Sequence, residues 1–206
     1  ARCVLAALVE AHGHGILHRD IKPANVILQQ TDPVEHAVLV DFGLAHSSLL
    51  DVGVSEPPLD CARYLSPEQA GLLDAEVSAC SDLYSTGVVL YECLAGQPPF
   101  TGLSISEVLR QHMTVPPAEL RSLGLPVPRV VDEVIQRLLR KDPRDRYQAA
   151  SAVLADVEAI AEALQRAETD PAVVIGMQDH RQTLTEPAFV GREEELASLD
   201  AQVRRT

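Results

Sequence analysis

The chain has 206 residues, of which 46% are hydrophobic and 23% are charged, proportions typical of a soluble globular protein. This length allows one good-sized domain, or one domain and a piece of another. A formal net charge of −13 argues against general nucleic-acid binding, which needs a basic face, and no apolar run is long enough to predict a transmembrane helix.

The first elements in chain order are predicted to be a helix and a short β-hairpin. Residues 4–10 carry apolar side chains at a helical spacing, and the glycines that follow break the helix. Two short β-rich runs, 26–28 and 38–40, are separated by a polar loop. If these runs pair as a hairpin, Asn25 and Asp41 lie at neighbouring strand ends, on one side of a cleft.

The middle of the chain is predicted to contain a long loop followed by a buried helix. Residues 44–67 show no sustained period and indicate an exposed loop, which at this length is usually functional or disordered. Residues 81–94 are apolar on most sides and predict the central core helix. We expect Ser81 to cap the start of this helix and Gly96 to end it.

The last part of the chain predicts two amphipathic helices and a linker. Apolar residues recur at a helical spacing over 130–139 and again over 151–165. Residues 167–188 lack periodicity and indicate a linker. Residues 191–196, Gly-Arg-Glu-Glu-Glu-Leu, then open a new helix.

Two motifs carry the chemistry. The stretch from His18 to Asn25 fits the pattern H-R-D-x-x-x-x-N, and residues 41–43 read D-F-G. Occurring in this order, joined by the two β-rich runs, the motifs form a strong signal. The chain resembles serine/threonine protein kinases of bacterial type. The resemblance implies an α+β, mainly α fold, in which residues 1–166 form the C-terminal lobe of a kinase domain with a short β-hairpin and without the N-terminal lobe.

The resemblance assigns a role to each polar residue of these motifs. Asp20 would be the base that accepts the proton of the substrate hydroxyl, and Lys22 would neutralise charge on the γ-phosphoryl group. Asn25 and Asp41 would bind Mg²⁺, which prefers oxygen ligands. Ile27 matches the apolar position under the adenine ring. The implied substrates are ATP and a protein hydroxyl.

Further matches involve residues that support the site. Residues 64–69 resemble the end of the kinase activation segment, with Ser66 where A-P-E has Ala. The resemblance implies a buried ion pair between Glu68 and Arg146, whereas the alternative is two unrelated surface charges. It also implies that Asp82, at the start of the central helix, tethers the backbone of the catalytic loop.

The catalytic loop and the activation segment also contain positions where regulation and substrate preference are expected. By resemblance, His18 anchors the catalytic loop, and Arg19 is of the kind that pairs with a phosphorylated activation loop. Among the serines of this segment, Ser55 is our expected phosphosite, the alternative being an exposed loop serine. Asp60 and Cys61 stand where the family shows Gly-Thr, and a thiol is a weaker hydrogen-bond donor than the Thr hydroxyl.

The chain also departs from the family in what it lacks. It has no G-x-G-x-x-G loop, and its only lysines are Lys22 and Lys141, so no nucleotide-pairing lysine precedes the catalytic loop. Because the first residues read as the interior of a helix, we expect truncation and take the missing N-terminal lobe as a partner. The fragment alone is expected to be inactive and poorly soluble, since apolar cleft surface would be exposed.

The C-terminal tail suggests a larger protein. Residues 189–196 resemble the G-R-E-x-E-L opening of an AAA/STAND-type ATPase, an acidic surface helix being the alternative. The predicted organisation is a kinase lobe over 1–166, a linker over 167–188 and the start of an ATPase domain over 189–206. The four scattered cysteines predict a reduced, cytoplasmic protein. From the negative net charge and the lack of a long apolar run, we expect no contact with nucleic acid through this segment and none with a membrane.

Three functions follow from these expectations. The first is an active serine/threonine protein kinase within a larger signalling regulator. The second is a pseudokinase or scaffold that controls the attached ATPase, which the residues Asp60 and Cys61 leave open. The third and weakest is a kinase-fold phosphotransferase that acts on small molecules.

Overall fold

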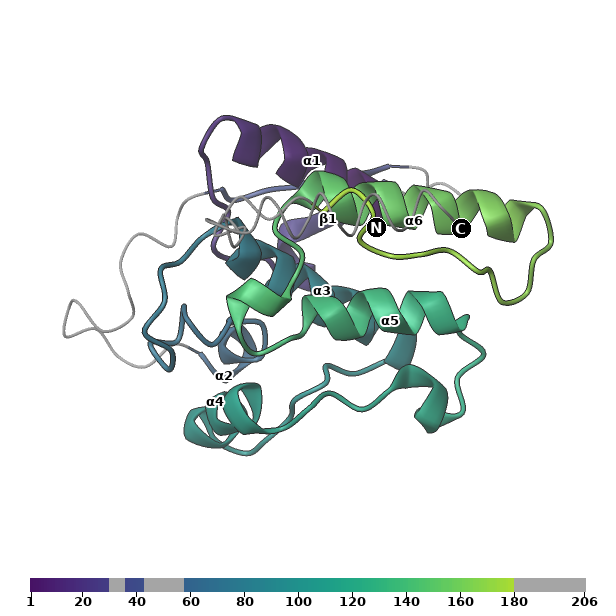
Figure 1. The fold of residues 1–206 in the computed structure, drawn as a ribbon. Helices are drawn as coiled ribbons and strands as arrows, with labels where there is room; N and C mark the ends of the chain where they lie inside the picture. Colours follow the sequence, from purple (N-terminus) through teal and green to yellow (C-terminus); the bar gives the residue numbers. More distant parts are fainter. Residues whose placement is uncertain (30–35, 43–57, 180–206) are drawn as a thin grey trace, which may run out of the picture.

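The computed structural model of the chain describes residues 1–29, 36–42 and 58–179. Within these ranges the chain forms α-helices, short 3₁₀ helices and one two-stranded sheet (Figure 1). The elements, in chain order, are α1 (Arg2–Gly13), η1 (Pro23–Asn25), β1 (Val26–Leu28), β2 (Ala37–Leu39), α2 (Leu59–Ala62), α3 (Ala79–Ala95), α4 (Ile105–Thr114), η2 (Leu120–Leu123), α5 (Arg129–Leu138), η3 (Pro143–Asp145) and α6 (Ala150–Gln165).

The helices pack in pairs around the central helix. Figure 1 shows α1 and α6 side by side, with α3 and α5 beneath them and the short α2 next to α4. The hairpin strand β2 packs against α1. The architecture is therefore α+β and mainly helical, with a short hairpin, as the sequence predicted.

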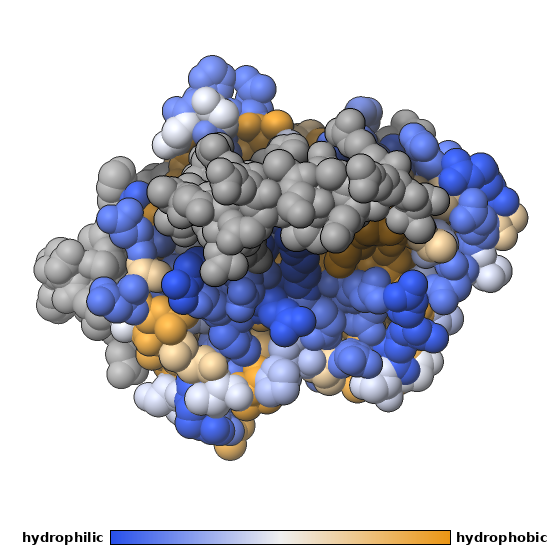
Figure 2. All heavy atoms as spheres, in the orientation of Figure 1, coloured by the Kyte–Doolittle hydropathy of each residue, from blue (hydrophilic) through white to orange (hydrophobic). Residues whose placement is uncertain are grey.

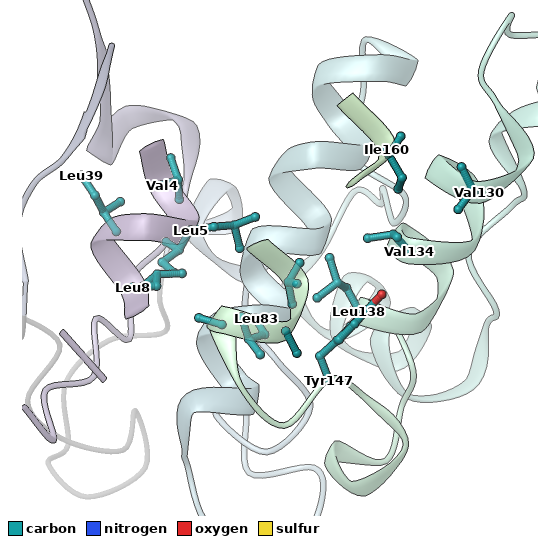
Figure 3. Close-up of a cluster of buried hydrophobic side chains, with 14 residues drawn as sticks. Val4, Leu5, Leu8, Leu39, Leu83, Val130, Val134, Leu138, Tyr147 and Ile160 are labelled. Carbon is teal, nitrogen blue, oxygen red and sulfur yellow. The ribbon is translucent and has the colours of Figure 1, made fainter. Parts of the chain in front are cut away.

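The main hydrophobic core lies where α1, α3, α5 and α6 meet. Leu5 and Leu8 of α1 are completely buried, and so are Leu83 of α3 and Leu138 of α5 (Figure 3). Burying an aliphatic side chain of this size contributes about 1.5–3 kcal/mol relative to leaving it exposed. The apolar face of α1, α5 and α6, visible in the sequence as a helical period, is the face that enters this core, whereas α3 is buried on most sides along 80–88.

The central helix α3 begins three residues earlier than the Ser81 cap would place it. Ser78 is the N-cap, and its side chain accepts a hydrogen bond from the Cys80 N–H, while Ser81 closes a capping box by accepting from the Ser78 N–H. The prediction that Ser81 is the cap was therefore wrong. Gly96 ends the helix in the left-handed conformation, as predicted (φ 78°).

The hairpin brings the two motifs together. β1 and β2 are antiparallel, with Val26 opposite Leu39, and the Val40 N–H donates to the Asn25 carbonyl at 3.0 Å. The second strand spans Ala37–Leu39, one residue before the predicted 38–40. Asn25 and Asp41 consequently lie at the same end of the hairpin.

Two parts of the observed structure differ from the sequence prediction. The end of the expected exposed loop contains the helix α2, which is followed by the fully buried Ser66. Pro58 and Asp60 are exposed, but an exposed loop was wrong for residues 61–67. The helix α4 was not predicted at all. Its signal was present in the sequence, because Ser104 caps the helix by accepting from the Glu107 N–H, the S-x-x-E pattern of a helix start.

Part of the expected linker is attached to the helices; we call residues 170–179 the docked segment. In this segment, the Asp170 side chain accepts a hydrogen bond from the Arg129 N–H at 2.8 Å. Asp179, whose side chain is completely buried, forms an ion pair with Arg137 and accepts from the Gln148 N–H at 2.8 Å. These contacts attach the docked segment to both ends of α5 and to the chain just before α6.

The surface of the described residues is largely polar. Figure 2 shows hydrophilic residues over most of the visible coloured surface, with hydrophobic ones in smaller patches. Among the described residues, no helix is both long and apolar enough to cross a bilayer.

Candidate active site

Two residues of the first motif, Lys22 and Asn25, donate hydrogen bonds to the carboxylate of a third, Asp20. Lys22 Nζ donates to Asp20 Oδ2 at 2.7 Å, and Asn25 Nδ2 donates to the same oxygen at 3.0 Å and to the Asp20 carbonyl at 2.8 Å. The Pro23–Asn25 turn makes this possible, since it bends the chain so that Asn25 faces Asp20. The Asp20 carboxylate is thereby oriented by two donors from its own loop.

The Lys22 ammonium is held in its charged form. Burial lowers the pKa of Lys22, but the hydrogen bond and negative charge of Asp20 outweigh it, so the pKa is raised overall. A positive charge therefore stands beside the Asp20 carboxylate at neutral pH.

The buried ring of His18 joins the two motifs. Its Nδ1 accepts a hydrogen bond from the Asp20 N–H at 3.2 Å, so its Nε2 carries the proton that is donated to the Val40 carbonyl at 2.8 Å. The ring also packs against Phe42, with the ring centroids 4.6 Å apart. His18 thus connects the backbone at Asp20 to the strand end that bears Asp41.

Asp82 of α3 holds the backbone of the H-R-D motif, the contact that the resemblance implied. Its two carboxylate oxygens accept from the His18 N–H at 2.9 Å and from the Arg19 N–H at 2.7 Å. The His12 side chain bonds the same carboxylate at 2.8 Å, a contact that the sequence did not indicate. Two hydrogen bonds to backbone N–H groups explain why a carboxylate is placed inside the core here.

Asp41 lies at the end of the hairpin, exposed to solvent and in the left-handed conformation (φ 64°). This conformation is uncommon for residues other than glycine, and such strain is concentrated at functional sites. Ile27, on β1, leaves 55% of its surface exposed, so it presents apolar area on the same hairpin.

Cys61 lies next to the catalytic loop. Its Sγ is 3.6 Å from Lys22 Nζ, although 39 residues separate the two in sequence. The neighbouring Asp60 points outward, with 86% of its side chain exposed, and pairs with Arg63. The structure thus brings the thiol, rather than the acidic residue, into contact with the loop of Asp20.

The predicted pair between Glu68 and Arg146 is present and completely buried. Ser81 adds a third partner, because its hydroxyl donates to Glu68 Oε1 at 2.8 Å. Burial raises the pKa of Glu68, but the hydrogen bonds and charge of Arg146 outweigh it, and the pKa is lowered. The pair is therefore ionic at neutral pH and anchors the end of the activation segment.

Some predicted features fall outside the described residues. These are the expected phosphosite Ser55, the glycine of the D-F-G motif (Gly43) and the tail at 189–206. Besides His12, sequence reasoning missed the side chain of Gln69, whose Nε2 donates to the carbonyl of Arg19. Its only signal was its place directly after the Ser66–Glu68 motif.

The family described as "Protein kinase domain" matches residues 1–157 of the chain. The chain is 41% identical over 156 residues to "Serine/threonine-protein kinase PknB" of Mycobacterium leprae, covering 73% of this chain and 24% of that protein. It is 40% identical over 167 residues to "Serine/threonine-protein kinase PknL" of Mycobacterium tuberculosis, covering 79% of this chain and 40% of that protein. The chain thus spans about a quarter of the PknB relative.

Solved structures agree with these matches. The crystal structure of Rad53 residues 1–466 in complex with AMP-PNP superposes with a TM-score of 0.60 at 28% identity, covering 76% of this chain and 38% of that one. The predicted kinase-like, α+β and mainly α fold is confirmed by these matches and by the arrangement of helices and hairpin. The chain belongs to the protein kinase domain family, with bacterial serine/threonine kinases among its relatives.

Proposed function

We propose that this chain contains the C-terminal lobe of a serine/threonine protein kinase, the lobe that carries the catalytic loop. Such a kinase transfers the γ-phosphoryl group of ATP to a protein hydroxyl. The observation that carries the proposal is the Asp20 carboxylate, held by Lys22 at 2.7 Å and by Asn25 at 3.0 Å. Phosphoryl transfer needs positioning and charge neutralisation more than covalent chemistry, and this group supplies both.

In the proposed reaction, the substrate hydroxyl oxygen forms a bond to the γ-phosphorus while the bond from that phosphorus to the bridging oxygen of ADP breaks. The hydroxyl proton passes to the Asp20 carboxylate. Lys22 lies 2.7 Å from that carboxylate, so its positive charge is close to the transferring group and offsets the negative charge there. His18 and Asp82 keep the backbone at Asp20 in place during transfer.

Two residues fit a magnesium site. Asn25 Nδ2 is committed to Asp20, which leaves its amide oxygen for a cation, and the exposed Asp41 carboxylate lies at the same hairpin end. Carbonyl and carboxylate oxygens are the donors that Mg²⁺ prefers. When bound between these residues and the phosphates, the ion would neutralise phosphate charge.

The proposal requires an N-terminal lobe, which we place before this chain. Ile27 exposes apolar area on the hairpin, where an adenine ring can pack. The Rad53 relatives of known structure were solved with AMP-PNP, which supports ATP as the nucleotide here. We call the protein that includes both lobes the two-lobed kinase, and we expect this chain alone to be inactive.

The larger setting is also part of the proposal. We place an AAA/STAND-type ATPase domain from residue 189 onward, on the G-R-E-x-E-L pattern of residues 191–196. Cys61, Cys80 and Cys93 are thiols, which supports a reducing, cytoplasmic location. Arg19 Nε is buried and has no hydrogen-bond partner among the described residues, which supports pairing with a phosphoserine such as Ser55.

Cys61 favours a second candidate function. A Thr hydroxyl at this position would hydrogen-bond strongly to the catalytic loop, whereas the thiol contacts Lys22 only at 3.6 Å. A site weakened in this way would suit a pseudokinase that binds nucleotide and controls the attached ATPase. Binding of Mg-ATP without turnover would support this candidate.

Phosphorylation assays on the two-lobed kinase test the proposal. With radiolabelled ATP, Mg²⁺ and casein, we expect label on the kinase or on casein, and its loss in the Asp20→Asn variant. The control is Asp74→Asn, which removes an exposed carboxylate outside both motifs and is expected to keep full activity. Unchanged labelling in Asp20→Asn would show that Asp20 is not the base.

The Ser55 assignment has its own test, which is phosphosite mapping of the active protein. Finding Ser55 unmodified would contradict the assignment.

A further inference from the structure

The side chain of Gln69 connects the substrate-side segment to the catalytic loop. Its Nε2 donates to the Arg19 carbonyl at 2.7 Å. Its Oε1 accepts from the Ser66 hydroxyl at 3.0 Å and from the Ser66 N–H at 3.3 Å. One amide therefore spans two segments that are 50 residues apart in sequence.

The orientation of this amide follows from its partners. A carbonyl oxygen can only accept a hydrogen bond, so the group facing Arg19 is the NH₂ of Gln69. A backbone N–H can only donate, so the group facing Ser66 is the amide oxygen. The position therefore calls for a side chain with a donor and an acceptor on one planar group. Glutamine meets this requirement, and an ionised glutamate does not.

The carbonyl that Gln69 holds belongs to the peptide group directly before Asp20. The N–H of the same peptide group is bonded by the His18 ring at 3.2 Å. Gln69 and His18 thus hold the two ends of one planar unit, and rotation of that unit would turn the Asp20 side chain. Arg19 has a left-handed backbone (φ 66°), a strained conformation that needs outside contacts to persist.

The other end of the connection is rigid. Ser66 is completely buried, and the next charged residue, Glu68, is fixed by its pair with Arg146. Gln69 lies beside this anchor, and its own N–H bonds the Ser66 hydroxyl at 3.4 Å. The end of the activation segment is therefore held in place, and the Gln69 amide extends from it to the catalytic loop.

We propose that Gln69 is a positioning residue for Asp20, and that it makes the orientation of the base depend on correct folding of the segment at Ser66. The inference rests on the proposed kinase function. Gln69 touches neither nucleotide nor transferring group in this role; it acts through the Arg19–Asp20 peptide. If the Gln69–Ser66 hydrogen bonds are lost, Gln69 no longer orients Asp20. Activity therefore depends on whether the activation segment is folded at Ser66.

The isosteric variant Gln69→Glu tests the inference in the two-lobed kinase. It keeps an oxygen toward Ser66 but places a second oxygen against the Arg19 carbonyl, which repels it. We expect kcat to fall by about tenfold or more, since small misplacements of a reacting group are costly. KM for ATP should change little, because the nucleotide contacts are elsewhere.

The pH dependence of kcat distinguishes a positioning role from a purely structural one. A protonated carboxylic acid can donate to the Arg19 carbonyl as the amide does. The ratio of the kcat of Gln69→Glu to that of the wild type should therefore rise as the pH is lowered from 8 to 5.5. Gln69→Leu has no proton to gain, so its ratio should stay low and flat. Circular dichroism confirms that each variant is folded.

The outcomes separate this inference from the proposed function. If Asp20→Asn is inactive but folded Gln69→Glu has the wild-type kcat, Gln69 is not a positioning residue and the kinase proposal stands. The inference would also be wrong if the kcat of Gln69→Glu is lowered by the same factor at every pH and this factor equals the loss of folded protein. If Asp20→Asn stays active, Asp20 is not the base and Gln69 cannot act by positioning it. If the wild-type two-lobed kinase labels neither itself nor casein, the proposed function itself is wrong.

Discussion

Arg146 donates from both terminal nitrogens to the two carboxylate oxygens of Glu68, at 2.6 and 2.9 Å, across 78 residues of sequence. Its remaining three N–H groups donate to the backbone carbonyls of Cys80, Arg140 and Lys141. All five donors of the guanidinium are therefore used, which is what allows a charged side chain to be completely buried. The pair fastens the end of the activation segment to the chain between α5 and α6.

The variant Glu68→Gln should be strongly destabilising. It leaves the Arg146 charge buried and without its counter-charge, and breaking a buried pair in this way costs about 3–5 kcal/mol. Urea denaturation of the two-lobed kinase measures the free energy of unfolding. The control is Glu133→Gln, which removes the exposed partner of Arg129 and should cost less than about 1 kcal/mol. Equal effects of the two variants would contradict the prediction.

Replacement of Cys61 by Thr should raise activity. A hydroxyl is a better hydrogen-bonding group than a thiol, so it should hold Lys22 and Asp20 more firmly than the present 3.6 Å contact. A gain of one ordinary hydrogen bond corresponds to an increase in kcat of about two- to tenfold. Steady-state kinetics check this, with Cys93→Thr as the exposed control. An unchanged or lower kcat in Cys61→Thr would show that the thiol is not what limits the site.

The docked segment should be sensitive to a methyl group at Gly176. A Cβ there would lie 1.8 Å from Arg137 Nη1, so the arginine would have to leave Asp179. Gly124 has the same left-handed backbone (φ +76° at both) but open space around it. Both alanine variants carry the backbone strain, and Gly176→Ala should cost at least about 1 kcal/mol more because it also breaks buried hydrogen bonds.

Thermal and urea unfolding of these two variants measure the difference. Hydrogen exchange of the Gln148 amide, which donates to Asp179, is a local readout of the same event. Faster exchange of this amide in Gly176→Ala but not in Gly124→Ala is the expected result. Identical stabilities would show that the docked segment contributes nothing to the lobe.

Stability should fall in mild acid partly because of His112. This buried ring bonds the Tyr84 hydroxyl and the Arg63 carbonyl, and burial, aided by the charge of Lys141, lowers its pKa from 6.5 to about 3. Between these values the unfolded chain binds a proton that the folded chain does not, so stability decreases as the pH falls from 6.5 toward 3. Glu68, with its lowered pKa, acts in the same direction.

The variant His112→Gln isolates this contribution. The slope of unfolding free energy against pH between 6 and 4 should become shallower by up to about 1.4 kcal/mol per pH unit. At pH 7 the variant should be less stable, because glutamine lacks the ring that packs against Tyr84 and Phe100. Denaturation curves at several pH values test both statements, and an unchanged slope would refute the assignment to His112.

The sequence by itself determined the family and the periodic elements. The patterns His18–Asn25 and D-F-G identify the chemistry because phosphoryl transfer restricts those positions to particular functional groups. The helices α1, α5 and α6 were predicted because each presents an apolar face at a helical period, and α3 was predicted because it is apolar on most sides. Burial of this apolar surface decides the local structure. The hairpin followed from two short β-rich runs.

Only the tertiary structure decided which polar groups meet. The bond from Gln69 to Arg19 and the contact of Cys61 with Lys22 join residues 50 and 39 positions apart, and no local pattern encodes such pairs. For the same reason the expected linker contains a docked segment, since its stability comes from partners on α5 and α6 rather than from any period of its own. The sequence specifies the chemical groups of the site, and the packing of the lobe sets the distances at which they act.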